Sequence, residues 1–248
     1  MSRALHVEHA GDPTHPLVVL VHGAMDRAAG MLRLSRRLDH DHFVIRYDRR
    51  GYGRSGKHPG PFHIDAHVDD LVALLDGRRA LLVGHSYGGN IVLAVAERHP
   101  ELVSAVAVYE APRSWEPWWP SSSAAAMAHE ATVDPADGAE LFMRRVIGDA
   151  RWEGLPERTR QIRRAEGVPL REELSSIRRG APWSGEGILA PTTIGYGTKA
   201  RPHHVQAMSE AAGLIPNAQL VVMPDCGHMA NQTHPDLFRE LLIDPLER

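Results

Sequence analysis

One serine stands in a setting that can make it a nucleophile. The segment Gly84-His85-Ser86-Tyr87-Gly88 follows the apolar run 80–83 and leads into an amphipathic stretch. A serine in a tight turn between a strand and a helix has its hydroxyl lifted clear of the sheet edge, and glycines two residues before and after it avoid steric clashes. We therefore predict that Ser86 attacks a carbonyl carbon.

A base for this serine is expected near the C-terminus. His228 lies in Met223-Pro224-Asp225-Cys226-Gly227-His228-Met229, directly after the last apolar run. A histidine on a loop at the same sheet edge can take the proton from Ser86 and return it to the leaving group. Among the 16 histidines of the chain, His228 is the predicted general base and acid.

A glycine-containing loop can stabilise the negative charge that develops on the carbonyl oxygen. It reads Val21-His22-Gly23-Ala24-Met25 and follows the first central apolar run. The backbone N–H of Ala24, together with that of Tyr87, would form a two-donor oxyanion hole. His22 itself is interpreted as a structural residue held by backbone hydrogen bonds.

The segments around these motifs alternate between two patterns. Short β-branched or leucine-rich runs predict strands, and longer amphipathic runs predict helices. Buried strands are expected at 17–21, 43–47, 80–83, 103–109, 191–196 and 219–223, an edge strand at 5–9, and helices at 27–38, 63–75, 88–98, 203–214 and 235–242. This alternation indicates an α/β fold with a mostly parallel sheet flanked by helices.

Residues 112–190 break the alternation, because they predict helices at 136–147, 156–166 and 170–179 and no strand. We interpret them as a helical cap inserted into a core of residues 1–111 and 191–248. All five tryptophans fall here, either as a lid over an apolar ligand or as packing anchors. Trp115, with Met25 and Met229 from the loops described above, is expected to contact substrate. Acids match the arginines of this segment, which favours a mixed, solvated surface over an anion-binding one.

The motifs resemble those of the α/β-hydrolase fold family over nearly the whole chain, from Leu5 to Leu246. The segment Asp48-Arg49-Arg50-Gly51-Tyr52-Gly53-Arg54-Ser55 is similar to the D-x-R-G-x-G-x-S turn common in that family. The order of serine first and histidine near the end also matches it. Dehalogenases and epoxide hydrolases of this fold need aspartate at the position of Ser86, so the resemblance implies a serine hydrolase of the esterase or lactonase kind.

The acid of the triad is not in its usual place. Most members of the family carry aspartate in a G-x-x-D loop, and here Gly197-Thr198-Lys199-Ala200 has alanine at that position. Glu110, at the end of the run 103–109, resembles the acid of a Y-E-x-P subgroup and of zearalenone-type lactonases, and is the predicted third member; Asp225 is the alternative. Contact between Glu110 and the His228 ring would favour catalysis, and separation would favour a non-hydrolytic protein.

Composition restricts the partners. The 28 basic and 31 acidic residues leave no positive field for nucleic acid. The single cysteine, Cys226, excludes an intramolecular disulfide. No apolar run reaches the roughly 18 residues of a membrane span, and no signal segment is evident, so we expect no membrane contact and a cytoplasmic location. His63 and His67 have the spacing of zinc ligands but lack the glutamate of a zinc motif, so neither metal nor cofactor is expected. A homodimer is compatible with the sequence.

The predicted function is hydrolysis of a small, mostly apolar carboxylic ester or lactone by Ser86, His228 and Glu110 through an acyl-enzyme. The partner is then a small-molecule substrate. Two alternatives stay open: a non-hydrolytic enzyme or small-molecule-binding protein with the same fold, and a hydrolase of carbon–carbon bonds.

Overall fold

A seven-stranded sheet organises the chain in the computed structural model, which describes residues 5–123 and 134–247. The strand order is β1-β3-β2-β4-β5-β6-β7, and only β1 runs antiparallel to its neighbour. The strands are β1 (Val7–Ala10), β2 (Leu17–Val21), β3 (Phe43–Tyr47), β4 (Ala80–His85), β5 (Val103–Tyr109), β6 (Thr192–Gly197) and β7 (Ala218–Met223). The predicted α/β fold with a mostly parallel sheet is confirmed.

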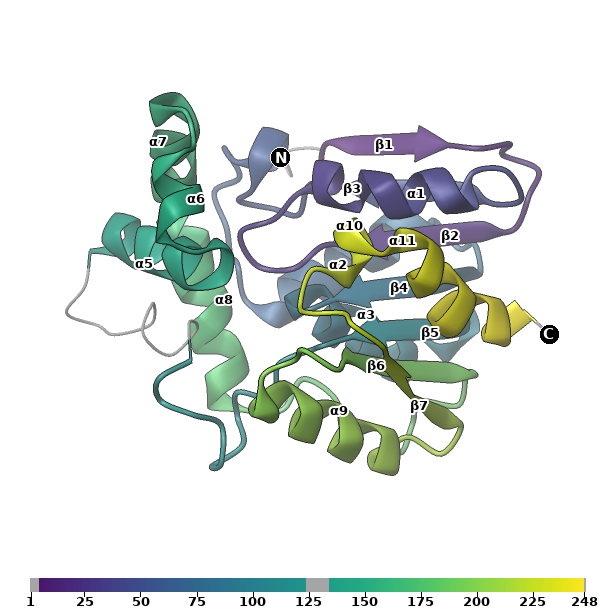
Figure 1. The fold of residues 1–248 in the computed structure, drawn as a ribbon. Helices are drawn as coiled ribbons and strands as arrows, with labels where there is room; N and C mark the ends of the chain where they lie inside the picture. The colour runs from purple at the N-terminus through teal and green to yellow at the C-terminus, as the bar shows by residue number, and fades with distance from the viewer. Residues whose placement is uncertain (1–4, 124–133, 248) are drawn as a thin grey trace.

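Helices cover both faces of the sheet (Figure 1). One face packs against α2 (Ile64–Leu75), α3 (Tyr87–Arg98) and α9 (Pro202–Leu214), and the other against α1 (Leu32–Leu38), α10 (Ala230–Thr233) and α11 (Pro235–Phe238). Alternate residues of β2 enter the two hydrophobic clusters, with Val19 and Val21 on one side and Val18 and Leu20 on the other. This alternation of fully buried side chains is typical of a central parallel strand.

The segment between β5 and β6, which we call the helical insertion (residues 112–190), holds α5 (Pro135–Ile147), α6 (Asp149–Glu153), α7 (Glu157–Ala165) and α8 (Gly167–Arg179). Residues 124–133 of this segment lie outside the described residues. Figure 1 shows these helices gathered beyond one end of the sheet, where the parallel strands end. No strand occurs in the described part of the insertion. Its boundaries as a separate cap stay a prediction.

Three elements differ from the sequence prediction. The strand predicted at 219–223 is confirmed as β7, but the prediction that it is buried is wrong, since β7 lies at the sheet edge and exposes Leu220 and Val222. The helix expected at 235–242 is α11 followed by a π-helical turn, Arg239–Ile243. The helix expected at 27–38 begins with the 3₁₀ turn Ala28–Met31. Apolar spacing sets the buried face of an element, but it does not distinguish an edge strand from a central one.

Over residues 5–123 and 134–247, no helix combines the length and the apolar character that a membrane crossing requires.

Candidate active site

Ser86 occupies a strained turn between β4 and α3. Its φ of 53° lies in the left-handed region, which is uncommon for a residue with a side chain. Both neighbouring glycines are sterically required, because a Cβ on Gly84 would lie 2.6 Å from the Gly88 carbonyl oxygen and one on Gly88 would lie 2.2 Å from the Val21 carbonyl oxygen. The sequence pattern therefore reports a real packing constraint, and the turn leaves Ser86 half-buried at the edge of the sheet.

The structure brings His228 and Glu110 together. Glu110 Oε2 lies 2.7 Å from His228 Nδ1, and the glutamate side chain is fully buried. An Nδ1–H that donates to this carboxylate leaves Nε2 free to accept a proton. Because His228 keeps about a third of its side chain exposed, the free nitrogen can reach a bound molecule.

Glu110 is held by its backbone as well as by its side chain. It follows β5 with a left-handed φ of 47°, and its N–H donates to the Gly195 carbonyl at 2.9 Å. Its Oε1 accepts from the Gly197 N–H at 3.2 Å. The strained turn aims the carboxylate across the end of β6 and toward His228. A hydrolytic triad requires a third group that orients the base in this way.

The alternative acid lies elsewhere. Asp225 is 86% exposed, and its carboxylate lies 3.5 Å from Lys199 Nζ. Its backbone N–H donates to Thr198 Oγ1 in the neighbouring loop at 2.9 Å. Ala200, at the family's usual acid position, lines the cavity described below and offers no carboxylate. Glu110 is therefore the carboxylate that contacts His228 among the residues described.

The oxyanion loop lies directly against the nucleophile. A Cβ on Gly23 would lie 3.0 Å from Ser86 Cβ, so a side chain at this position would require the nucleophile or the loop to shift. Ala24 and Tyr87 both line the cavity that contains Ser86. Within residues 5–123 and 134–247, neither of their N–H groups has a hydrogen-bond acceptor. Two free donors beside a serine hydroxyl can hold a developing oxyanion.

His22 fixes the shape of this loop. Its Nδ1 donates to the Gly23 carbonyl at 2.8 Å, and its Nε2 accepts from the Arg49 N–H at 2.9 Å. Burial, with the nearby Arg49 guanidinium, lowers the pKa of His22 well below its ordinary value. A buried ring with a lowered pKa and both nitrogens hydrogen-bonded is a structural element, as the sequence predicted for this histidine.

Three further histidines surround His228. The ring centroids of His85 and His204 lie 4.8 and 5.0 Å from that of His228, and His203 is adjacent to His204. Burial, with a contribution from His228, lowers the pKa of His85 to about 3 and that of His204 well below its ordinary value. Burial also lowers the pKa of His203. Near neutral pH these rings add little positive charge that would oppose protonation of His228.

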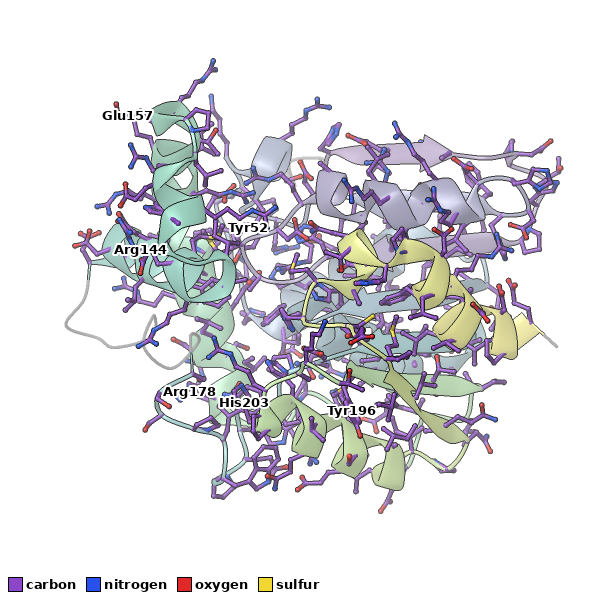
Figure 2. All side chains as sticks on the ribbon, in the orientation of Figure 1. Tyr52, Arg144, Glu157, Arg178, Tyr196 and His203 are labelled. Carbon is purple, nitrogen blue, oxygen red and sulfur yellow. The ribbon has the colours of Figure 1, made fainter. Side chains whose placement is uncertain are left out.

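A cavity of about 270 Å³ lies between the ends of the strands and the helical insertion. That volume is near the lower end of the range for small-molecule sites. Figure 2 labels His203 at the start of α9, on the side of the sheet that faces the insertion. The remaining lining residues are, from the core, Ala24, Ser86, Tyr87, Glu110, Lys199, Ala200, Arg201, His204 and His228, and from the insertion Pro112, Trp119, Ser123, Phe142, Arg145, Val146 and Leu174.

None of the three predicted substrate contacts lines this cavity. Met25 is buried in a cluster with Tyr52 and Trp152. Trp115 stands edge-on to Trp183, with ring centroids 5.7 Å apart, so it anchors the insertion. Met229 lies half-buried in the turn before α10. Substrate contact for these residues stays a prediction, which their packing does not support.

The tryptophan that lines the cavity is Trp119 instead. Its ring centroid lies 4.7 Å from that of His203 and 5.4 Å from that of His204. Its indole N–H donates to Ser123 Oγ at 3.1 Å. The sequence left open whether the tryptophans contact a ligand or serve as packing anchors. Trp119 lines the cavity, and Trp115 packs against another tryptophan. Because Trp115 and Trp119 are the same residue type in one short segment, the sequence gave no signal that distinguishes their two roles.

Sequence reasoning missed a buried polar cluster that joins the core to the insertion. Arg49 and Glu173, both fully buried, form an ion pair, and Tyr52 donates to Glu173 at 2.7 Å. His67 Nε2 also lies 2.8 Å from Glu173. The Arg49 guanidinium donates to the Gly23 carbonyl at 3.1 Å, so the same cluster supports the oxyanion loop. The D-x-R-G turn marked Arg49 as a residue of interest, but its partner Glu173 on α8 is too distant in sequence for a local pattern to indicate the pair.

One group of side chains has the spacing of a metal site. Ligand atoms of Glu110, His204 and His228 all lie within 4.8 Å of one another. Glu110 and His228 already contact each other, so a cation bound there would compete with that contact. His63 and His67 do not form a second such group, because His63 caps α2 and His67 is turned toward Glu173. The absence of a metal or cofactor stays a prediction.

Comparison with known proteins assigns the family. The sequence profile of the alpha/beta hydrolase family matches residues 18–241, and the chain belongs to that family. A curated relative is the 2-(acetamidomethylene)succinate hydrolase of Mesorhizobium japonicum, which is 26% identical over 243 residues, covering 90% of this chain and 84% of the relative.

Solved structures agree with this assignment. The enol-lactonase from Burkholderia xenovorans LB400 superposes with a TM-score of 0.73 at 25% identity, covering 95% of this chain and 94% of the other. A thermophilic esterase from Thermogutta terrifontis has a TM-score of 0.73 at 23% identity, covering 94% and 89% of the two chains, and supports the fold.

Proposed function

We propose that the protein is a serine hydrolase that cleaves a small carboxylic ester or lactone through an acyl-enzyme. The observation that carries the proposal is the 2.7 Å contact between Glu110 Oε2 and His228 Nδ1 beside the cavity that Ser86 also lines. Two relatives named as a hydrolase and an enol-lactonase support a carbonyl substrate.

In the first half of the reaction, Ser86 Oγ attacks the carbonyl carbon and its proton passes to His228 Nε2. The N–H groups of Ala24 and Tyr87 hold the oxyanion, and Glu110 stabilises the imidazolium. The tetrahedral intermediate then expels the alkoxide, which takes the proton from His228 and leaves an acyl group on Ser86.

In the second half, water attacks the acyl carbon while His228 accepts its proton. Collapse of the second intermediate returns the proton to Ser86 and releases the carboxylic acid. Opening of a lactone follows the same steps, except that the alcohol and the acid remain in one product. The scheme uses a small-molecule substrate and no cofactor, nucleic acid or membrane, and we place it in the cytoplasm.

The contact between Glu110 and His228 weighs against a non-hydrolytic ligand-binding protein, because such a protein has no need of an oriented base. Hydrolysis of carbon–carbon bonds would use the same residues. Only the substrates that the protein turns over, and not the geometry of the site, distinguish it from ester hydrolysis.

The test is covalent labelling with a fluorophosphonate, followed by a panel of esters, lactones and β-diketones of increasing acyl length. We expect labelling of wild type but not of Ser86→Ala, and turnover of short esters or lactones. A folded wild-type protein that resists labelling at Ser86 would overturn the proposal. Turnover of β-diketones alone would replace ester cleavage by carbon–carbon cleavage.

A further inference from the structure

Three cationic side chains line the same cavity as Ser86. Arg145 comes from the end of α5, and Lys199 and Arg201 come from the loop between β6 and α9. All three are exposed, which places their charged groups at the solvent side of the cavity. We call Arg145, Lys199 and Arg201 the cationic mouth.

The cavity offers these cations no free negative charge. Glu110 is the only carboxylate among the described lining residues, and its two oxygens already contact His228 and the Gly197 N–H. The nearest acid to Lys199 is Asp225, at 3.5 Å and largely exposed to water. An exposed ion pair of this kind contributes little and is easily exchanged.

The lack of an ion-pair partner distinguishes Arg145 from the arginine that precedes it. Arg144 forms ion pairs with Glu140, Asp149 and Glu153. Arg145, the next residue, has no carboxylate within ion-pair distance among residues 5–123 and 134–247, and the same holds for Arg201. The Arg201 side chain donates to the Arg145 carbonyl oxygen at 3.4 Å, which holds the two arginines close together.

Cations gathered at the mouth of a cleft raise the local concentration of anions and favour their binding. A guanidinium presents paired N–H donors whose geometry matches a carboxylate. Acids pair with Arg144 in the insertion, but among residues 5–123 and 134–247 no acid does so for Arg145 or Arg201. The three positive charges lie at the solvent side of the cavity, where they would meet a negatively charged part of a ligand whose carbonyl lies at Ser86.

We propose that the cationic mouth binds a free carboxylate on the substrate, while the reacting carbonyl lies at Ser86. The substrate class is then a monoester of a small dicarboxylic acid, or a lactone that carries a carboxylate. The inference rests on the proposed hydrolase function and adds an anionic end to a substrate whose remaining surface packs against Trp119, Phe142 and Val146. The cavity volume of about 270 Å³ limits this substrate to a short chain.

The test compares three methyl esters with five-carbon acyl chains that differ in terminal charge. They are monomethyl glutarate, methyl pentanoate and methyl 5-(trimethylammonio)pentanoate. We expect kcat/KM to be at least about tenfold higher for the anion than for the neutral ester, mainly through a lower KM, and lowest for the cation. This preference should shrink as ionic strength rises from about 0.01 to 0.15 M, because salt screens exposed charges.

The double variant Arg145→Gln, Arg201→Gln should reduce the preference for the anion to about twofold or less. The matched control is Arg158→Gln, since Arg158 is exposed and follows Glu157, which Figure 2 labels at the far end of α7. This control removes one positive charge from the insertion without touching the cavity, and it should keep the preference of wild type.

Two failures can be told apart by labelling Ser86 with a neutral fluorophosphonate. If Ser86 is labelled but the anionic and neutral esters react equally well, or if the double variant keeps the wild-type preference, the cationic mouth does not select the substrate. If Ser86 is not labelled and none of the three esters is turned over, the proposed hydrolase function is wrong and this inference falls with it.

Discussion

The two walls of the cavity are built in different ways. On the core side, Ser86 and Glu110 have left-handed backbones, and His228 is tied to Glu110 by a 2.7 Å contact. On the insertion side, Phe142 and Val146 are side chains on one face of α5, without comparable hydrogen bonds. The first wall, which we call the core wall, orients individual polar groups, and the second, which we call the insertion wall, fills space. We therefore expect the chemistry to depend on the core wall, and the fit of the apolar part of the substrate to depend on the insertion wall.

The largest expected effect tests whether Ser86 and His228, on the core side of the cavity, act together in catalysis. We expect Ser86→Ala, His228→Ala and the double variant to lose about the same factor in kcat, on the order of 10⁶, because they act as one unit. The measurement is single-turnover hydrolysis of a short ester, with near-ultraviolet circular dichroism to confirm folding. Additive losses would mean that Ser86 and His228 do not share a step.

The acid gives the next largest effect. Glu110→Gln should lower kcat at least about 100-fold, since the amide cannot stabilise the imidazolium. The matched control, Asp225→Asn, changes an exposed carboxylate three residues before the base and should do little. The reverse ranking in steady-state kinetics would assign the acid to Asp225.

The core wall could largely be predicted from the sequence, because local rules set the positions of its catalytic candidates. Glycines around Ser86, and the placement of Glu110 and His228 after apolar runs, report backbone constraints that act over a few residues. Parallel strands then bring their carboxyl ends to one edge. Even the missing family acid at Ala200 pointed to the residue that contacts His228.

The insertion wall could not be predicted in the same way. Trp115 and Trp119 belong to one short segment, yet Trp115 packs on Trp183 and Trp119 lines the cavity. Both tryptophans lie in turns or bends and not in a helix or strand, so no periodic pattern distinguishes the packing side chain from the one that lines the cavity. The pairing of Arg49 with Glu173 depends on tertiary contacts over 124 residues, which no local pattern records.

A bulky residue on the insertion wall should change substrate choice. Val146→Phe fills space in the cavity, and we expect the ratio of kcat/KM for hexanoyl over acetyl esters to fall about tenfold. The matched control is Val168→Phe, at an exposed valine of α8 that does not line the cavity. Equal ratios in both variants would show that α5 does not shape the acyl site.

The core wall also predicts a dependence of stability on pH. His85 has a pKa of about 3 when folded, against about 6.5 in the unfolded chain. Between these values the unfolded chain binds more protons, so the free energy of unfolding should fall with falling pH, by up to about 1.4 kcal/mol per pH unit. Urea unfolding at several pH values measures this slope.

His85→Gln can keep a donor to the His228 carbonyl while it removes the titrating ring, so its slope should be shallower than that of wild type. The control His15→Gln, at an exposed position, should leave the slope unchanged. An unchanged slope in His85→Gln would mean that other groups govern the acid sensitivity of the fold.

The most direct test of the account is the mass of the protein during turnover of a slowly deacylated ester. We predict that the peptide containing Ser86 gains the mass of the acyl group minus one hydrogen, and that the Ser86→Ala protein gains nothing. Turnover without an acyl adduct at Ser86, or an adduct on another residue, would contradict the claim that Ser86 is the nucleophile.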